Sequence, residues 1–316
     1  MKAPYVWFGG KSKIAPLVWE RLGNVDLYLE PFAGSIATLL ARPHVGNREV
    51  INDLDGFVPN FWRAIQKDSE LVLHHAKNPI IESDVHARNH WLEGNRSSLS
   101  AKLEGDPFYY DAMIAGWWVW TLSATISGVF GNKGPWVVKD GMLVKSDPSS
   151  GIKRSIPAMS YGYIRGFLSL HNPEKTFQDL SERIQDLTVV CGDWSRILKP
   201  SVIGKANTVG VMLDPPYGGE GYDTHVYAGG SVGTVSSDVL AWCIENGSDP
   251  IYRIALCGYE GEHNELESLG WDKLEWKSYG GMSALALKSQ RGKENSHKER
   301  VWFSPHCLNN EAPSLF

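Results

Sequence analysis

Cysteine is scarce in this sequence, and its few occurrences do not form a recognisable pair. The four cysteines are far apart and no C-x-x-C motif occurs, so we expect neither a zinc ribbon nor a dithiol redox site. They stand at Cys191, Cys243, Cys257 and Cys307. Few scattered cysteines suit a reducing compartment, which predicts a cytoplasmic protein.

An excess of basic charge is also missing. The formal net charge is −5, although aromatic residues reach 11% and tryptophan occurs 13 times. A global positive field that attracts nucleic acid is therefore excluded, and any nucleic-acid surface must be a local basic patch.

Long apolar runs are few. The N-terminal segment MKAPYVWFGGKSK has no apolar h-region, which predicts that no signal peptide is present. One uncharged stretch, residues 112–132, is long enough to span a bilayer. Its serines and threonines and its moderate aliphatic content favour a buried helix, so we expect no membrane partner.

Strand and helix patterns alternate at both ends of the chain. The 316 residues suit two domains or one domain with a large insertion. We expect helices at 14–22, 35–41 and 58–66 and strands at 25–29, 49–51, 187–191, 208–213 and 251–257, with late antiparallel strands at 271–279 and 300–303. Residues 67–185 interrupt this rhythm, and within them residues 136–145 predict a β-hairpin that turns at Asp140-Gly141. The sequence thus predicts one doubly wound α/β sheet with an insertion.

The first motif with chemical content is Glu30-Pro31-Phe32-Ala33-Gly34, at a strand-to-helix turn. Such a turn brings backbone N–H groups and a helix N-terminus beside a bound ligand. Asp53 follows Gly34 by 19 residues, at the end of the next strand, where a nucleoside-binding sheet places a carboxylate for ribose hydroxyls. The alternative is a plain connecting turn, since the dinucleotide fingerprint G-x-G-x-x-G is not present here.

The segment Gly10-Lys11-Ser12 superficially resembles a P-loop. That loop also needs a glycine five residues before the glycine of the Gly-Lys pair, where this chain has Tyr5, and no strand precedes it. We therefore reject nucleoside triphosphate binding at this segment.

The third motif, Asp214-Pro215-Pro216-Tyr217, follows the apolar strand expected at 208–213. Two prolines fix the backbone and leave carbonyls without local partners. An acceptor carboxylate, rigid carbonyls and an aromatic ring suit an amino group on a planar base. The alternative is a proline turn with a surface tyrosine.

Taken in order, these motifs resemble those of the Dam-like DNA adenine-N6 methyltransferases. That family carries aromatic-x-Gly-Gly-Lys, Glu-Pro-Phe-x-Gly, an Asn/Asp-rich strand end, a DNA-recognition insertion and Asp-Pro-Pro-Tyr. The corresponding segments are residues 7–11, 30–34, 51–53, 67–185 and 214–217, and the tail at 298–305 is similar to that of phage-type members.

The resemblance implies a SAM-dependent methyltransferase, where SAM is S-adenosylmethionine. The expected fold is α/β: a Rossmann-like sheet from residues 1–66 and 186–316, and a mostly helical target-recognition insertion with a β-hairpin at 67–185. The implied cofactor site comprises Trp7, Gly9, Gly10, Lys11, Glu30, Pro31, Phe32, Ala33, Gly34, Asp53, Asp193, Trp194 and Asp214. Trp7 and Lys11 would close the methionine end, and Asp193 is equally well explained as a helix N-cap.

The implied chemistry is site-specific methylation of adenine N6 in double-stranded DNA, with the base flipped out of the duplex. The implied catalytic residues are Asp214, Pro215, Pro216 and Tyr217, and no metal is required. Candidate DNA contacts are Lys133, Lys139, Lys145, Lys153, Arg154 and Arg165, with a second basic cluster at Lys288, Arg291, Lys293, Lys298 and Arg300. For each single basic residue the alternative is a solvated surface charge.

Other functions remain open from the sequence. They are cytosine-N4 methylation, a SAM-dependent DNA-binding regulator without catalysis, and methylation of RNA or protein on the same kind of sheet. The recognition sequence, a restriction partner and the oligomeric state are not determined by the residues.

Overall fold

The computed structural model describes residues 1–5, 7, 9–44, 48–124, 136–140, 142–145, 171–217, 232–276 and 299–308. The chain divides into two compact units. The first comprises residues 1–2, 9–55 and 186–316, and the second comprises residues 3–8 and 56–185. The expected boundary after residue 66 falls inside the helix α3 (Phe57–Ala76), and the expected domain assignment stays a prediction.

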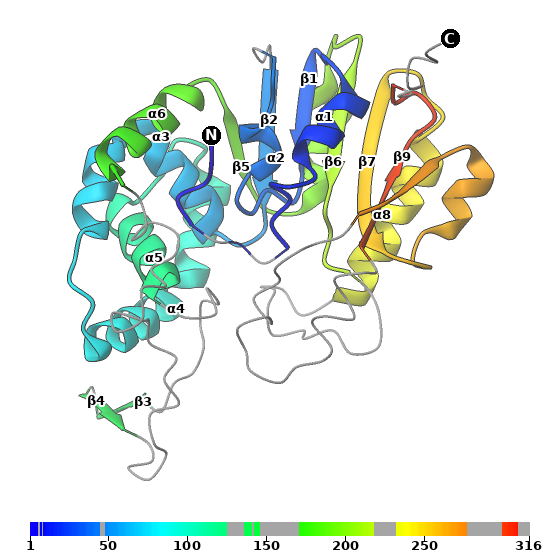
Figure 1. Cartoon of the computed structure of the whole chain (residues 1–316). Coiled ribbons are helices and arrows are strands. Elements are labelled where there is room, and N and C mark those ends of the chain that lie inside the picture. The colour runs from blue at the N-terminus through cyan, green and yellow to red at the C-terminus, as the bar shows by residue number, and fades with distance from the viewer. Residues whose placement is uncertain are drawn as a thin grey trace. The chain divides into compact units, whose positions relative to one another are not determined.

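The first unit contains a seven-stranded sheet in the order β5-β2-β1-β6-β7-β9-β8 (Figure 1). Its strands are β1 (Leu27–Glu30), β2 (Arg48–Asp53), β5 (Thr188–Cys191), β6 (Val209–Leu213), β7 (Tyr252–Tyr259), β8 (Asp272–Glu275) and β9 (Glu299–Phe303). The pairs among β5, β2, β1, β6 and β7 are parallel, which confirms the expected α/β sheet.

The last two strands pair as expected. β9 is antiparallel to β7 and to β8, which confirms the antiparallel pairing expected for the two late strands. β8 is antiparallel only to β9 and therefore runs in the same direction as the five parallel strands. The sequence could not reveal this, because direction depends on which strand each segment pairs with.

Both faces of the central strands β1 and β6 are buried, since alternate residues enter different cores. Leu27 and Leu29 of β1 join Val209, Val211 and Leu213 of β6 in one hydrophobic cluster. Helices on this face contribute to the same cluster: η2 (Trp194–Leu198), α7 (Pro200–Ile203) and α8 (Val232–Asn246). Burial on both faces explains why β6 reads as an uninterrupted apolar run.

The alternate residues of β1 meet α1 (Ala15–Leu22) and the short α2 (Ala37–Leu40). Tyr28 packs against Trp19 with ring centroids 4.7 Å apart, and the Trp19 indole N–H donates to the Thr38 carbonyl at 2.7 Å. Glu30 points to the same side as Tyr28, because residues two apart on a strand share a face.

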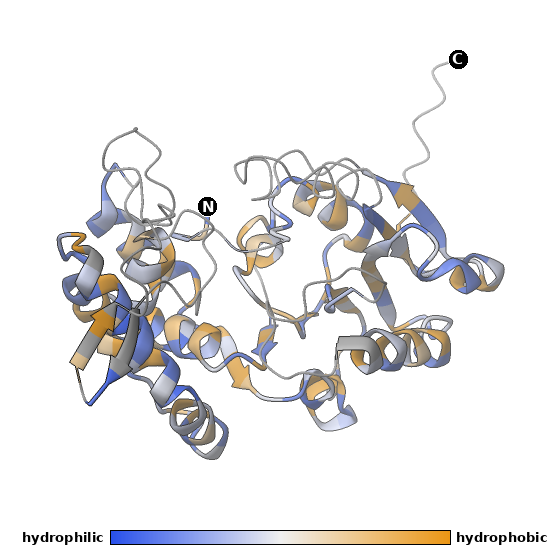
Figure 2. Cartoon of the chain, turned by 90° about the horizontal axis from the view of Figure 1, so that it is seen from below, coloured by the Kyte–Doolittle hydropathy of each residue, from blue (hydrophilic) through white to orange (hydrophobic). Residues whose placement is uncertain are grey.

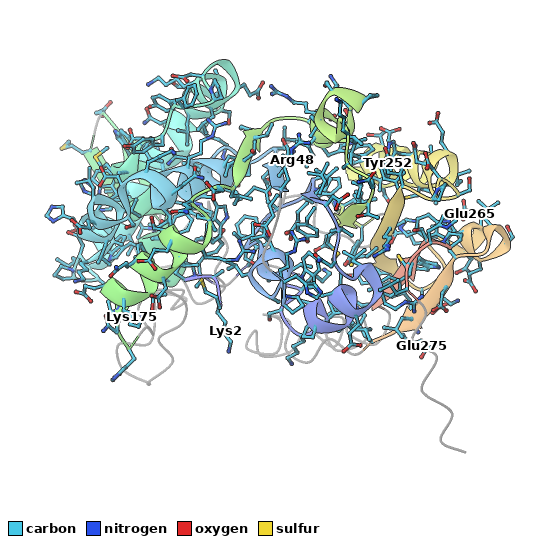
Figure 3. The ribbon with its side chains drawn as sticks, turned by 90° about the horizontal axis from the view of Figure 1, so that it is seen from above. Lys2, Arg48, Lys175, Tyr252, Glu265 and Glu275 are labelled. Carbon is cyan, nitrogen blue, oxygen red and sulfur yellow. The ribbon has the colours of Figure 1, made fainter. Side chains whose placement is uncertain are left out.

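The strand order reverses direction between β1 and β6. From β1 the chain adds β2 and then β5 on one side, whereas β6 and β7 are added on the other. In open α/β sheets the carboxyl ends of strands beside such a reversal form the ligand-binding crevice. Figure 3 looks at the opposite edge, where Arg48 begins β2 and Tyr252 begins β7.

The second unit is mostly helical. Its described helices are α3 (Phe57–Ala76), α4 (Glu82–Gly105), α5 (Ala112–Ala124) and α6 (Pro173–Arg183). α3 packs most extensively against α5, and Trp118 of α5 lies among the rings of Tyr5, Phe57 and Phe61. Figure 2 shows hydrophobic and hydrophilic residues mixed along the helices, as expected where one side is buried.

Three local expectations in this unit can be compared with the structure. The helix expected at 58–66 extends to Ala76, across a kink where Asp68 leaves helical geometry (φ −153°, ψ 56°). The hairpin is confirmed as β3 (Trp136–Lys139) and β4 (Met142–Lys145), and φ of Asp140 is 52°, as a type I′ turn requires. α5 is buried, and among the described residues no helix has both the length and the hydropathy to span a bilayer.

Candidate active site

The turn after β1 is fixed by the end of β2. The Ala33 N–H donates to the Asn52 carbonyl at 2.9 Å, and the Asn52 side-chain amide donates to the Pro31 carbonyl at 3.1 Å. Gly34 has φ 44°, a left-handed conformation that favours glycine, and its N–H donates to Asp53 Oδ2 at 2.9 Å. The turn and the acidic residue that the sequence singled out are therefore in direct contact.

Asp53 carries a carboxylate that has capacity left for a ligand. Its Oδ2 accepts from Gly34 and its Oδ1 accepts from the Asp55 N–H at 2.9 Å. Burial raises the pKa of Asp53 to about 7, although hydrogen bonds from the backbone N–H groups of Gly34, Asp55 and Leu54 oppose the rise. Since a carboxylate has about four acceptor sites, these three donors leave room for one more bond, such as one from a ribose hydroxyl.

Glu30 is held inside the first unit. It is 5% exposed, and its Oε2 accepts from the Tyr28 hydroxyl at 3.1 Å. Burial raises the pKa of Glu30 to about 8. The Tyr28 hydroxyl that donates to Glu30 lies on the side of the sheet that α1 and α2 cover. The expected contact of Glu30 with a cofactor stays a prediction.

The segment after β5 supplies an aromatic surface. Trp194 stacks on Phe32, with ring centroids 6.0 Å apart and an angle of 21° between the planes. Asp193 is exposed, and its Oδ1 accepts from the Ser195 N–H at 2.9 Å, which makes it the N-cap of η2. The N-cap interpretation is thus confirmed, and a role of Asp193 toward a cofactor stays a prediction.

Asp214 follows β6 directly and has both carboxylate oxygens engaged. Lys11 Nζ lies 2.7 Å from Oδ2, and the Tyr217 hydroxyl donates to Oδ1 at 2.9 Å. The side chain of Lys11 is 5% exposed and that of Asp214 is 24% exposed. The tetrapeptide therefore presents a partly accessible carboxylate that is anchored on two sides.

Lys11 reaches Asp214 from the segment before α1. Its Nζ also donates to the Gly9 carbonyl at 2.8 Å and lies 5.4 Å from the centroid of the Tyr217 ring. Burial lowers the pKa of the Lys11 ammonium, but the Asp214 carboxylate outweighs it and the net pKa lies above the ordinary value. The sequence assigned Lys11 to the methionine end of the cofactor and expected it to bond backbone or a carboxylate, but it did not identify Asp214 as that carboxylate.

Tyr259 is the residue of this region that sequence reasoning missed. It ends β7, and its ring meets that of Tyr217 edge to face with centroids 4.7 Å apart. Burial raises the pKa of the Tyr217 hydroxyl, which keeps it a donor to Asp214. The available signal was the position of Tyr259 two residues after the strand predicted at 251–257, on the same edge of the sheet as Asp214.

Trp7, Gly9 and Gly10 are the remaining candidates of the N-terminal motif. Trp7 belongs to the second unit, where its ring lies 6.0 Å from those of Tyr5 and Trp118. Gly9 and Gly10 are exposed, and Gly9 has φ 72°. Their expected roles toward a cofactor stay predictions.

Of the candidate DNA contacts, the structure describes only those on the hairpin and one in β9. Lys139 is exposed at the end of β3, and Lys145 ends β4, where it pairs with Trp136. Arg300 is largely buried in β9 and forms ion pairs with Glu260 and Glu275. The other candidates lie outside the described residues: Lys133, Lys153, Arg154, Arg165, Lys288, Arg291, Lys293 and Lys298.

Two further observations concern polar side chains. The Ser123 hydroxyl of α5 donates to the Val119 carbonyl at 2.9 Å, one turn earlier in the same helix. Among the described residues, no group of three or more His, Cys, Asp or Glu side chains could hold a metal ion.

Comparison with family models finds a match in the N-terminal part of the chain. Residues 7–98 match the family model of D12 class N6 adenine-specific DNA methyltransferases. The matched segment includes the Gly9–Lys11 motif, the turn after β1 and Asp53, and it ends before Asp214. It confirms the resemblance that the motifs indicated. A search of curated proteins found no match.

Proposed function

From the D12 class N6 adenine-specific DNA methyltransferase match at residues 7–98, we propose that the chain methylates adenine N6 at specific sites in double-stranded DNA, with SAM as the methyl donor and with base flipping. The observation that carries the proposal is the Asp214 carboxylate. It stands at the carboxyl end of β6, beside the reversal of strand order, and is anchored by Lys11 and Tyr217.

The difficulty of the reaction lies in the acceptor. The lone pair of adenine N6 is delocalised into the ring, so the nitrogen is a poor nucleophile. Hydrogen bonds from both N6–H groups to Asp214 and to the Pro215 carbonyl favour a pyramidal nitrogen with a directed lone pair. After transfer, the Asp214 carboxylate is a ready acceptor for the released proton. The rate gain would come from positioning and electrostatics.

The first unit has residues that fit SAM. Asp53 keeps acceptor capacity for ribose hydroxyls, the turn at Gly34 brings backbone close to a ligand, and Phe32 and Trp194 offer stacked rings for an adenine. When bound, SAM supplies an activated methyl group on a sulfonium. These side chains would bind and orient it.

Access to N6 requires the adenine to leave the duplex, because N6 is paired inside it. Tyr217 would then stack on the flipped base. Its ring is already supported from the side by Tyr259, and its hydroxyl is fixed by Asp214. DNA recognition would come from residues 67–185, with phosphate contacts from the hairpin. A cytoplasmic enzyme of a bacterial or phage-infected cell fits this substrate.

Two rivals are weaker. Cytosine-N4 methylation poses the same problem at an exocyclic amine, but the family match is to adenine-specific enzymes. A regulator without catalysis has no need of an anchored acceptor, and Asp214 and Tyr217 are both present and bonded.

The proposal predicts that Asp214→Ala loses methyl transfer while the fold survives. Loss of an acceptor at the reacting nitrogen should slow transfer about 100-fold or more. The assay is transfer of a labelled methyl group from SAM to duplex DNA, followed by sequencing of the methylated bases. SAM affinity is measured in parallel by calorimetry, because Asp214 also belongs to the expected cofactor site.

The matched control is Asp238→Ala, which removes an exposed aspartate from α8 and should leave the rate unchanged. Activity of Asp214→Ala within a few-fold of the unmodified chain would exclude the catalytic role. Methylated cytosine in place of adenine would establish the N4 alternative.

A further inference from the structure

The ion pair between Lys11 and Asp214 has features that a surface pair lacks. Lys11 is almost fully buried, and its Nζ makes a short contact to Asp214 Oδ2 and a hydrogen bond to the Gly9 carbonyl. The Tyr217 hydroxyl holds the other carboxylate oxygen. An ammonium buried to this degree without a counter-charge would be costly, so the pair is part of the folded site.

Two anchors on one carboxylate determine its orientation. A carboxylate held at a single oxygen can still turn about its side-chain bonds, whereas bonds to both oxygens fix the plane of the group. Lys11 also lies over the Tyr217 ring, 5.4 Å from its centroid, so a single cation touches both chemically important side chains of the tetrapeptide. Fixed acceptors are what electrostatic catalysis needs, because they require no reorganisation during the reaction.

The region around Asp214 also contains other carboxylates, whose negative charge favours a cation there. Glu30 and Glu299 both interact electrostatically with this region: Asp214 contributes to the raised pKa of Glu30, and Glu299 acts on the pKa of Lys11. Without Lys11, Asp214 would lose the ammonium that pairs with it and would still interact with these carboxylates.

We propose that Lys11 is a positioning residue for Asp214: it fixes the carboxylate that receives the substrate amine, instead of serving mainly to hold the cofactor. This inference rests on the proposed function. It assigns Lys11 a role in the rate of methyl transfer within the bound complex and not in SAM affinity.

The test is a double-mutant cycle with Lys11→Met, Asp214→Asn and the double variant. Single-turnover methyl transfer is measured at saturating SAM and DNA, and the Kd for SAM is measured by calorimetry. Lys11→Met should slow saturated transfer at least ~10-fold and change the Kd less than ~3-fold. In the Asp214→Asn background, removal of Lys11 should add less than about 2-fold, since both residues act as one unit.

Lys13→Met is the matched control, because Lys13 lies two residues further on and is exposed; its rate should be unchanged. If Lys11→Met weakens SAM binding and keeps the saturated rate, Lys11 holds the cofactor and the proposal is wrong. If the two effects on the rate multiply independently, Lys11 does not act through Asp214.

Rescue provides a second arm. Small primary alkylamines should restore transfer by Lys11→Ala in a saturable manner, whereas tetramethylammonium, which donates no hydrogen bond, should not. Lys11→Arg keeps the cation and replaces the neutral variants in the test if these fail to fold. It should show a slower rate of methyl transfer at saturating SAM and DNA, with unchanged SAM affinity. Equal response to both kinds of ammonium would contradict a bonded role.

One readout does not depend on activity. In carbon NMR of labelled lysine, Lys11 should stay protonated at a pH where exposed lysines titrate, and Asp214→Asn should remove this difference. If the NMR result holds while the unmodified chain methylates no DNA, the proposed function fails and the pairing stands. If the unmodified chain is active and Lys11 titrates like exposed lysines, the pairing fails and the function stands.

Discussion

Glu30 and Asp53 end the neighbouring strands β1 and β2, and both resist ionisation. Burial raises the pKa of Glu30 to about 8 and that of Asp53 to about 7. In the unfolded chain both groups titrate near their ordinary values of 4.5 and 3.8. Between the two sets of values the folded state binds more protons than the unfolded state. The free energy of unfolding therefore falls as the pH rises through this window.

Glu30→Gln should flatten this pH dependence. A glutamine still accepts from the Tyr28 hydroxyl but cannot ionise, so the loss of stability between about pH 5 and pH 8 should be smaller than in the unmodified chain. Urea unfolding at a series of pH values measures the free energy of unfolding of both chains. A pH profile identical to that of the unmodified chain would mean that Glu30 ionises normally in the folded state.

Asp53 is the residue on which the cofactor assignment depends most. Asp53→Asn keeps one oxygen to accept from the Gly34 N–H and loses the second carboxylate oxygen, so the turn should survive. Calorimetry should show SAM affinity reduced about 10-fold or more, in line with the loss of a charged acceptor of ribose hydroxyls. Unchanged affinity would remove Asp53 from the cofactor site.

At the scale of elements, α3 and α5 approach too closely for a side chain at Gly116. A Cβ there would lie 2.5 Å from the His75 Cβ and 2.6 Å from the Val72 carbonyl oxygen, and backbone cannot yield cheaply. Gly116→Ala should destabilise the chain by about 1–3 kcal/mol in urea unfolding.

Gly94 gives the matched comparison. It lies inside α4, and a Cβ added there would have nothing within 4 Å of it, so only helix propensity is at stake. Gly94→Ala should stabilise by about 0.5–1 kcal/mol. If both substitutions shift the midpoint in the same direction, helix propensity and not the α3–α5 distance controls stability at Gly116.

At the scale of the whole molecule, a chain with net charge −5 must bind DNA through a few local cations. Combined replacement of Lys139, Lys145 and Arg154 by alanine should weaken DNA binding. Each lost phosphate contact should reduce the salt dependence by about one unit of slope. SAM affinity should not change, because the first unit holds most of the expected cofactor residues. Titrations at several salt concentrations measure both quantities.

A charge-matched control replaces Lys67, Lys199 and Lys205, which are exposed, by alanine. It changes the net charge equally and should leave the slope nearly as it was. If the hairpin variant and the control behave alike, the hairpin makes no specific phosphate contacts, and the basic residues at 288–298 become the next candidates.

The sequence by itself determined the local elements and the motifs at their ends. Apolar runs bounded by Glu30, Asp53 and Asp214 predicted strands that end at one edge of a parallel sheet, and the structure places all three residues there. The hairpin at Asp140-Gly141 was predictable for the same reason, since a two-residue turn has its own sequence preference.

Only the tertiary structure decided which of these ends meet. Tyr259 supports Tyr217 because the strand order brings β6 and β7 together, and Lys11 pairs with Asp214 because the segment before α1 lies against the end of β6. The burial that raises the pKa of Glu30 likewise depends on packing of α1 and α2. Hydrophobic periodicity reports one segment at a time, whereas ion pairing and desolvation depend on neighbours that the sequence does not place.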